Sequence, residues 1–260
     1  MTRHGVAILA GVNDPTLERT IPPLDAWAAK SRMPEVFPVW VGYRNNEWPL
    51  DTRLLAALRQ RGVEPVIFLE STGVRYDAIL AGTYDQSLTA LAHKADGLVV
   101  RWDQEPNGTG AGFEWQREPK RSLYVKTFQY VSALLRGVAN IRMFYCPVGR
   151  GARDNDMPDY YPGGQATQVV GFDRYSSAAY GKFPFQQWDY ALDYWQTRTP
   201  KKPIWVGECG RTYGLPRSAR WLKETEQRRV DTCIVFDMLL PQFDDDWRWT
   251  PTMYRAFKDM

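Results

Sequence analysis

Residues 97–105 read Gly-Leu-Val-Val-Arg-Trp-Asp-Gln-Glu, a short apolar and β-branched run that starts at a glycine and ends in polar side chains. Such a run is typical of a buried β-strand. Eight runs of this kind follow one another along the chain, starting near Gly5, Val36, Pro65, Gly97, Ile141, Gln168, Pro203 and Thr232. The first and last starts are 227 residues apart, about 32 per step, which is the length of one strand–helix unit.

Helical patterns fill the intervals between these strands, at residues 24–30, 51–61, 87–94, 122–136, 186–196 and 218–229, and another closes the chain at 254–259. Eight strand–helix units predict an α/β fold of the (β/α)8 or TIM-barrel type. Such a barrel takes about 250 residues, so we expect one domain spanning residues 1–260. An open doubly wound sheet is the alternative, but the chain lacks the glycine-rich phosphate-binding motifs of nucleotide-binding enzymes.

The charges of the chain are nearly balanced, with 33 Lys and Arg against 30 Asp and Glu and no basic block. A nucleic-acid-binding surface is therefore not expected. No apolar run reaches the roughly 18 residues that a membrane span needs, and the stretch 5–11 is too short for the core of a signal peptide. We expect a soluble chain without a visible targeting signal.

The cysteines Cys146, Cys209 and Cys233 fit no zinc or redox spacing, and two histidines cannot form a histidine-rich metal cluster. We interpret the cysteines as small buried hydrophobic residues, and we expect no metal and no cofactor. The aromatic content is unusual, at 11 Trp, 14 Tyr and 11 Phe. Tryptophan fills cores, but it also forms platforms for the apolar faces of sugar rings, so this excess is suggestive of a carbohydrate ligand.

The fourth predicted strand carries polar residues toward its C-terminal end, where (β/α)8 barrels have their active sites. Because side chains alternate along a strand, Arg101, Asp103 and Glu105 share one face if the strand stays regular that far. Pro106 follows Glu105 and favours extended geometry in the residue before it. Glu105 is therefore expected at the mouth of the barrel.

The seventh predicted strand ends in a second glutamate. By alternation Ile204, Val206 and Glu208 share one face, while Trp205 and Cys209 look the other way. The apolar pair beneath Glu208 is expected to line the barrel interior, which places Glu208 at the mouth as well. The glycines that flank Glu208 are consistent with a backbone crowded beside a ligand.

Two facing carboxylates at a barrel mouth are the equipment for glycoside hydrolysis. One is held protonated and donates its proton to the leaving oxygen, while the other stays ionised and attacks the anomeric carbon. Carboxylates about 5 to 5.5 Å apart give a covalent glycosyl-enzyme and retention of configuration. A solvated strand end is the ordinary fate of either glutamate alone, so their joint placement carries this prediction.

Three motifs in this order resemble glycoside hydrolase family 26. They are R-W-D-Q-E-P-N-G at 101–108 with Trp115 downstream, Y-Y-P-G-G followed by V-V-G-F-D-R-Y at 160–175, and K-P-I-W-V-G-E-C-G at 202–210. That family belongs to a large clan of retaining (β/α)8 glycosidases whose acid/base ends strand four and whose nucleophile ends strand seven. The resemblance covers roughly the middle and later thirds of the chain.

The resemblance implies a role for each residue that matches a motif. Glu105 is implied to be the acid/base and Glu208 the nucleophile. Arg101 is expected below the mouth, where its charge helps to keep Glu208 ionised. Tyr175 is expected to donate a hydrogen bond to the nucleophile, and Trp115 to line the sugar cleft.

Two departures from the family affect the inferred substrate. The family usually has histidine before its acid/base, where it contacts substrate, and this chain has Gln104, which hydrogen-bonds but carries no charge. After strand eight the family commonly has a tryptophan beneath the sugar, whereas this chain reads F-D-M-L-L-P at 236–241, with Trp247 and Trp249 later. We include Trp247 among the substrate-binding candidates. Because most characterised members cut β-mannans, β-1,4-mannan is the leading substrate.

Further residues near strand ends are candidates with competing structural interpretations. Asp237, at the end of strand eight, either bonds a sugar hydroxyl or caps a loop. Glu70, at the end of strand three, could contact sugar but needs a nearby cation. Trp40 and Tyr43 could form a platform, although Trp40 could equally be core. Asp173 is expected to be the buried partner of an arginine.

The sequence thus predicts a retaining, endo-acting β-glycoside hydrolase that acts on an oligo- or polysaccharide without a cofactor, as a monomer. The alternatives within the same chemistry are a β-xylan, a mixed-linkage β-glucan or a bacterial envelope glycan. An alternative from another class is a barrel that binds carbohydrate but has lost catalysis. A polymeric substrate would imply secretion or release by lysis.

Overall fold

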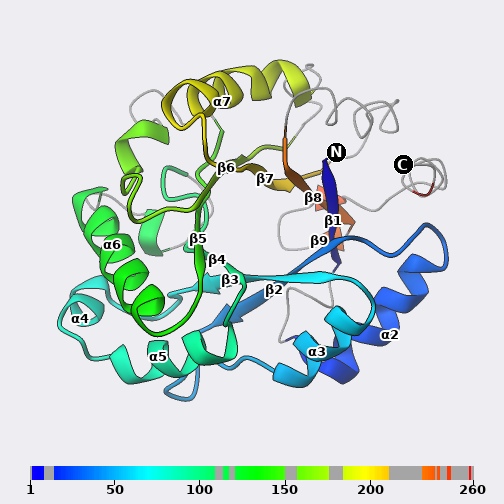
Figure 1. The fold of residues 1–260 in the computed structure, drawn as a ribbon, viewed down its shortest axis with the longest axis horizontal. Coiled ribbons are helices and arrows are strands. Elements are labelled where there is room, and N and C mark those ends of the chain that lie inside the picture. Colours follow the sequence, from blue (N-terminus) through cyan, green and yellow to red (C-terminus); the bar gives the residue numbers. More distant parts are fainter. Residues whose placement is uncertain are drawn as a thin grey trace.

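The computed structural model describes residues 2–8, 15–108, 114–116, 121–149, 157–175, 184–210, 230–237, 239–240, 245–246 and 258. Eight parallel strands form a closed barrel, in the order in which they follow along the chain (Figure 1). They are β1 (Arg3–Ile8), β2 (Val36–Gly42), β3 (Glu64–Glu70), β4 (Val99–Trp102), β5 (Arg142–Tyr145), β6 (Val169–Asp173), β7 (Ile204–Cys209) and β8 (Thr232–Asp237). The predicted (β/α)8 barrel is confirmed, and every predicted strand start lies within two residues of an observed one.

The barrel closes between its first and last strands. β1 pairs with β8 in parallel, with Arg3 opposite Thr232 at one end and Ile8 opposite Asp237 at the other. The Arg3 Nη2 atom also donates a hydrogen bond to Thr232 Oγ1 at 3.0 Å. This closure excludes the open doubly wound sheet, in which the outer strands remain unpaired on one side.

The helices surround the barrel on its outside (Figure 1). They are α2 (Leu17–Ala28), α3 (Thr52–Gln60), α4 (Tyr76–Leu80), α5 (Asp85–Lys94), α6 (Arg121–Val138) and α7 (Pro184–Arg198), with 3-10 turns η1 (Glu114–Gln116) and η2 (Met157–Tyr160). The short strands β9 (Leu239–Leu240) and β10 (Asp245–Asp246) form a separate antiparallel pair. Among the described residues, no helix is long and apolar enough to cross a membrane.

One predicted helix differs from the structure, one observed helix was not predicted, and two predicted helices cannot be compared with the structure. α2 begins at Leu17, before Pro22 and Pro23, whereas the sequence pattern started after them because proline usually ends a helix. Burial of its apolar face against the barrel holds this helix together despite the two prolines. The five-residue α4 is too short for a periodic pattern. The predicted helix at 218–229 lies outside the described residues, as does the one at 254–259 apart from Lys258.

Apolar side chains form two layers, one inside the barrel and one between the strands and the helices. A cluster inside the barrel contains Trp40, Phe68, Phe144 and Trp205 together with smaller residues of the other strands. A larger cluster lies between the strands and the helices. The barrel interior is therefore a packed core, and the polar side chains that reach the C-terminal ends of the strands rest on top of it.

The predicted alternation on β7 is wrong. Ile204 and Val206 belong to the outer cluster and Trp205 to the inner one, so the apolar pair faces the helices. A Cβ on Gly207 would meet the inward-facing atoms Cys146 Sγ at 2.5 Å and Asp173 Oδ1 at 2.8 Å, so this glycine faces inward too. The pairing of β7 with β6 and β8 shifts register at this point, which identifies a β-bulge. The bulge turns Glu208 inward immediately after Gly207.

The predicted regular extension of the fourth strand is also wrong, because β4 ends at Trp102. Asp103 and Glu105 have φ angles of 38° and 51°, in the left-handed region that non-glycine residues rarely occupy. The chain therefore turns sharply here, and Glu105 is not extended despite the proline that follows it. The strained turn, and not strand alternation, aims the Glu105 side chain.

Candidate active site

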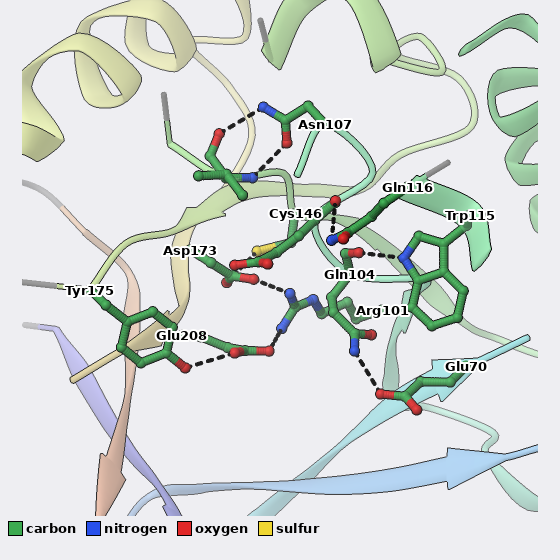
Figure 2. Close-up of polar contacts among 12 residues, drawn as sticks. Glu70, Arg101, Gln104, Asn107, Trp115, Gln116, Cys146, Asp173, Tyr175 and Glu208 are labelled. Carbon is green, nitrogen blue, oxygen red and sulfur yellow. Dashed lines mark hydrogen bonds and ion pairs between the residues drawn. The ribbon is translucent and has the colours of Figure 1, made fainter. Parts of the chain in front are cut away.

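Glu208 lies near the C-terminal end of β7 and accepts two hydrogen bonds, one from Arg101 of β4 and one from Tyr175, which follows β6 (Figure 2). Arg101 Nη1 lies 2.6 Å from its Oε1, and the Tyr175 hydroxyl donates to its Oε2 at 2.7 Å. Both donors favour the ionised carboxylate. The sequence had placed Arg101 and Tyr175 beside Glu208, and these two contacts are present in the structure.

Arg101 is fully buried and pairs with two carboxylates. Besides Glu208 it holds Asp173 through its other terminal nitrogen, and its guanidinium lies 4.5 Å from the centroid of the Phe68 ring. Burial acts to lower the pKa of Arg101, but the negative charges of Asp173 and Glu208 outweigh it and raise the pKa well above the usual value. The expectation that Asp173 is the buried partner of an arginine is confirmed.

Asp173 ends β6 opposite Glu208 of β7 and accepts a second hydrogen bond from the Cys146 thiol, at 3.0 Å. Burial raises the pKa of Asp173 well above the ordinary value, in opposition to Arg101 and Cys146, which favour the ionised form. One buried cation thus serves two carboxylates, and a third, Glu105, is close enough to act on Asp173 electrostatically.

Glu105 is held by its backbone on both sides of the turn. Its N–H donates to the Cys146 carbonyl at 3.0 Å, and its own carbonyl accepts from Gln116 Nε2 at 2.9 Å. Burial, followed by the negative charge of Glu208, raises the pKa of Glu105 to about 7, against the opposing effect of Arg101 and Arg174. The two glutamates therefore lie within electrostatic reach of each other, and Glu105 keeps its proton up to near neutral pH.

Gln104, which precedes Glu105, is 6% exposed and is fixed at two points. Its side-chain Nε2 donates to Glu70 Oε1 at 2.6 Å, and its backbone carbonyl accepts from the Trp115 indole at 2.7 Å (Figure 2). Burial and the nearby charge of Glu208 raise the pKa of Glu70, whereas Gln104 and Arg101 lower it. Arg101 supplies a positive charge near Glu70, but its effect is smaller than those of burial, Gln104 and Glu208, and the pKa of Glu70 stays above its ordinary value.

Trp115 was expected to line the sugar cleft. Its ring is 3% exposed and packs in the layer between the barrel and the helices. Little of the ring is thus open to a ligand, and its visible contribution is the hydrogen bond to the backbone between Gln104 and Glu105.

The two platform candidates separate in the structure. Trp40 is 8% exposed, lies in the cluster inside the barrel with Tyr175 packed against it, and meets Phe68 edge-on at 4.7 Å. Tyr43 instead packs in the outer layer on Trp48 and Tyr84, with ring centroids 4.6 and 5.1 Å away. The suggested pairing of Trp40 with Tyr43 as one platform is wrong, because the two rings lie on opposite sides of the sheet.

The remaining candidates cannot be placed as side chains. Trp247 and Trp249 lie outside the described residues. The backbone of Asp237 ends β8, whereas its side chain is outside the described part of the structure. In the part of the chain that the structure describes, no group of His, Cys, Asp and Glu side chains could hold a metal ion.

Two residues of the site were not predicted from the sequence. Cys146 bonds both to Asp173 and to the Glu105 backbone, although it was interpreted as a small hydrophobic residue. Asp103 is fully buried and accepts from the Ser71 N–H at 2.7 Å, the Ser71 hydroxyl at 2.6 Å and the Tyr76 hydroxyl at 2.7 Å. Burial raises the pKa of Asp103 to about 7. The signal for Cys146 was its position immediately after the fifth strand.

Comparisons with known proteins were informative only at the level of structure. No protein-family model matches the sequence, and no curated protein matches it. A β-mannanase of glycoside hydrolase family 26 from Bacteroides ovatus superposes with a TM-score of 0.69 at 16% identity, over 99% of this chain and 87% of that one. A mannanase from Bacillus subtilis gives 0.67 at 15% identity, over 99% and 83%.

A more distant match is endo-glycoceramidase II from Rhodococcus sp., with a TM-score of 0.57 at 12% identity over 91% of this chain and 73% of that one. At these identities the likenesses establish the fold alone. That fold is the (β/α)8 barrel found in mannanases of glycoside hydrolase family 26.

Proposed function

We propose that this chain is a retaining glycoside hydrolase that cleaves internal β-glycosidic bonds of a polysaccharide. The observation that carries the proposal is the contrast between two neighbouring carboxylic acids. Glu105 has a pKa raised to about 7, which suits a proton donor at neutral pH. Glu208 accepts hydrogen bonds from Arg101 and Tyr175, which suits an ionised nucleophile.

In the first step of the proposed reaction, a Glu208 carboxylate oxygen bonds to the anomeric carbon while the glycosidic carbon–oxygen bond breaks. Glu105 gives its proton to the departing oxygen, so the leaving sugar departs as an alcohol. Arg101 and Tyr175 hold the Glu208 carboxylate in one orientation throughout. The product of this step is a covalent ester between the sugar and Glu208, with Glu105 ionised.

In the second step, ionised Glu105 takes a proton from water, and the water oxygen bonds to the anomeric carbon. The ester bond to Glu208 breaks and the sugar leaves with its original configuration. Both glutamates return to their starting charge. The chemistry needs no group beyond the side chains of this chain and water.

We propose β-1,4-mannan as the substrate, supported by the shared barrel and by mannan cleavage in the proteins that carry it. Gln104, in the position next to the proton donor, leaves β-xylan, mixed-linkage β-glucan and a bacterial envelope glycan as the competing polymers. A panel of these polysaccharides, with products separated by chromatography, distinguishes them. Release of manno-oligosaccharides of several lengths is expected from endo action on mannan.

A mechanism-based fluorosugar tests the chemistry directly. A 2-deoxy-2-fluoro glycoside with a good leaving group slows the second step, so the covalent intermediate accumulates. Mass spectrometry of the digested protein is expected to find the sugar on the peptide that contains Glu208. Binding of the polysaccharides without any adduct or cleavage would instead identify a carbohydrate-binding barrel that has lost catalysis.

A further inference from the structure

Cys146 lies immediately after β5 and contacts both halves of the candidate active site. We propose that Cys146 is a positioning residue. Its thiol donates a hydrogen bond to Asp173, which lies opposite Glu208 in the pairing of β6 with β7, and its backbone carbonyl accepts a hydrogen bond from the Glu105 N–H. The consequence for catalysis rests on the proposed hydrolase function, whereas the effect on the charge of Asp173 does not.

The thiol contact is with the nucleophile side of the site. Cys146 is 1% exposed, and its Sγ lies 3.0 Å from Asp173 Oδ1, while the other Asp173 oxygen is held by Arg101. Burial raises the pKa of the Cys146 thiol well above its usual value, so the sulfur keeps its proton and acts as the donor. Asp173 therefore accepts a bond at each oxygen, and both bonds favour its charged form.

The backbone contact is with the proton-donor side. The Glu105 N–H donates to the Cys146 carbonyl at 3.0 Å, directly within the strained turn where Glu105 has a φ of 51°. A hydrogen bond at this peptide stabilises a conformation that is costly for a glutamate. One residue thus links the peptide of Glu105 to Asp173, the partner of Glu208 across β6 and β7.

The space around the sulfur shows that this contact is closely packed. A Cβ on Gly207 would lie 2.5 Å from Cys146 Sγ, and Gly207 is the residue of the β-bulge next to Glu208. The sulfur therefore occupies the space that the missing side chain at 207 leaves. Cys146 packs against the bulge as well as bonding to Asp173.

Charged and titratable groups surround Asp173 from four strands. The groups that interact with it electrostatically are Arg101 of β4, Glu208 and Cys209 of β7, Tyr175 after β6, Glu105 after β4 and Cys146 after β5. Among these groups Arg101 and Cys146 favour its ionised form, and Glu208 and Glu105 disfavour it. Coupled sites act on one another reciprocally, so loss of the Asp173 proton favours retention of the proton on Glu105.

The first test needs no substrate. The protein is labelled with 13C at the side-chain carboxyls of Asp and Glu, and Asp173 and Glu105 are titrated by NMR, with Asp173→Asn and Glu105→Gln used for assignment. Cys146→Ala is expected to raise the pKa of Asp173 by roughly half a unit, the size of a weak thiol hydrogen bond. The titration of Glu105 is expected to move the opposite way, to lower pH.

Two variants separate this role from simple packing. Cys146→Ser keeps a donor at the same place, so Asp173 is expected to titrate at or below its pH in the unsubstituted protein. Cys233→Ala removes another fully buried thiol, which lies in the outer cluster and contacts Cys209 Sγ at 3.4 Å instead of an Asp173 oxygen, so neither carboxylate is expected to change its titration. If Cys146→Ala does not fold, Cys146→Ser against the unsubstituted protein decides, because the hydroxyl is the stronger donor.

The second test measures kcat/KM against pH on the substrate that the polysaccharide panel identifies. Cys146→Ala is expected to shift the basic limb to lower pH, and Cys146→Ser to restore it. Unchanged carboxyl titrations in Cys146→Ala, or a Cys146→Ser variant that behaves as Cys146→Ala does, overturn the proposal. Absence of hydrolysis by the unsubstituted protein contradicts the proposed function instead, and leaves the NMR result to decide the role of Cys146.

Discussion

Glu105 and Glu208 carry the same functional group, and their neighbours give the two carboxyl groups different surroundings. Glu208 receives two hydrogen bonds, one of them from a cation. Glu105 is buried beside the charge of Glu208, and no side-chain donor to its carboxyl group is seen among the described residues, so its pKa rises to about 7. A difference in surroundings of this kind is what assigns acid and nucleophile in a two-carboxylate mechanism.

Replacing the nucleophile tests the assignment of Glu208. Glu208→Gln preserves the shape of the side chain but cannot form the ester, so kcat is expected to fall by at least about 10^4-fold, as when a nucleophile is removed elsewhere. Circular dichroism is expected to show an unchanged fold. Activity within tenfold of the unsubstituted protein would remove Glu208 from the mechanism.

The pH dependence tests Glu105. Because Glu105 must be protonated in the first step, kcat/KM is expected to decrease above about pH 7 as the acid loses its proton. Glu105→Gln is expected to abolish this basic limb and to slow hydrolysis of ordinary substrates. An aryl glycoside with a good leaving group needs no protonation, so it should partly recover the first step in that variant, and the release of the phenol reports it.

At the scale of elements, the bulge in β7 determines which way the Glu208 side chain points. Trp205 and Gly207 already face inward by alternation, and the bulge adds Glu208 to the same side. The cost of this arrangement is that position 207 has no room for a side chain. Gly207 is therefore part of the bulge that turns the Glu208 side chain inward.

The need for glycine at position 207 can be tested by adding one methyl group there. Gly207→Ala would bring a Cβ to 2.5 Å from Cys146 Sγ and 2.8 Å from Asp173 Oδ1, so strand β7 must shift and activity is expected to fall by two orders of magnitude or more, about the effect of a 1 Å misplacement. The matched control is Gly137→Ala in α6, where nothing lies within 4 Å. The control should keep full activity, because an added Cβ at position 137 meets no atom that has to move. Equal activity in both variants would contradict the role of the bulge.

The sequence pattern predicts the strands well and the local geometry of the site poorly. All eight strands follow from short apolar runs, because a parallel barrel buries both faces of each strand. Ile204 and Val206 were placed inside because alternation assumes one residue per register step, and a bulge breaks that rule. Glu105 and Glu208 were proposed because Glu208 lies near the end of β7 and Glu105 three residues beyond the end of β4, whichever way the side chains of those strands point.

Side-chain partners across strands were harder to predict. The link from Cys146 to Asp173 joins two strand ends, and no local motif records it. Asp103 looked like a neighbour of Glu105 on one face, but the turn after β4 directs it to Ser71 and Tyr76. These contacts depend on the twist and register of the closed barrel, which the order of residues alone does not specify.

At the scale of the whole molecule, buried acids make the fold sensitive to pH. Asp103 has a pKa of about 7 in the fold and an ordinary value of 3.8. Below pH 4 both the folded and unfolded chains hold this proton. Between about pH 4 and 7 only the folded chain does, so stability is lost progressively as the pH rises, by on the order of a few kcal/mol for such a shift.

Thermal unfolding at several pH values checks this linkage. The chain is expected to be more stable at pH 5 than at pH 8, and Asp103→Asn to reduce the difference because the amide has no proton to lose. Glu105→Gln, whose parent acid has a similar pKa, is expected to act in the same direction. If neither substitution changes how the unfolding temperature depends on pH between pH 5 and 8, other groups determine that dependence.

The pairing of β1 with β8, which closes the barrel, also constrains the order in which the barrel can form during synthesis. Arg3 meets Thr232 across this pair of strands, and the two are 229 positions apart. During synthesis β1 therefore emerges well before β8, the neighbour that completes its pairing. Until β8 has been made the barrel cannot close, and one edge of β1 has no strand to pair with.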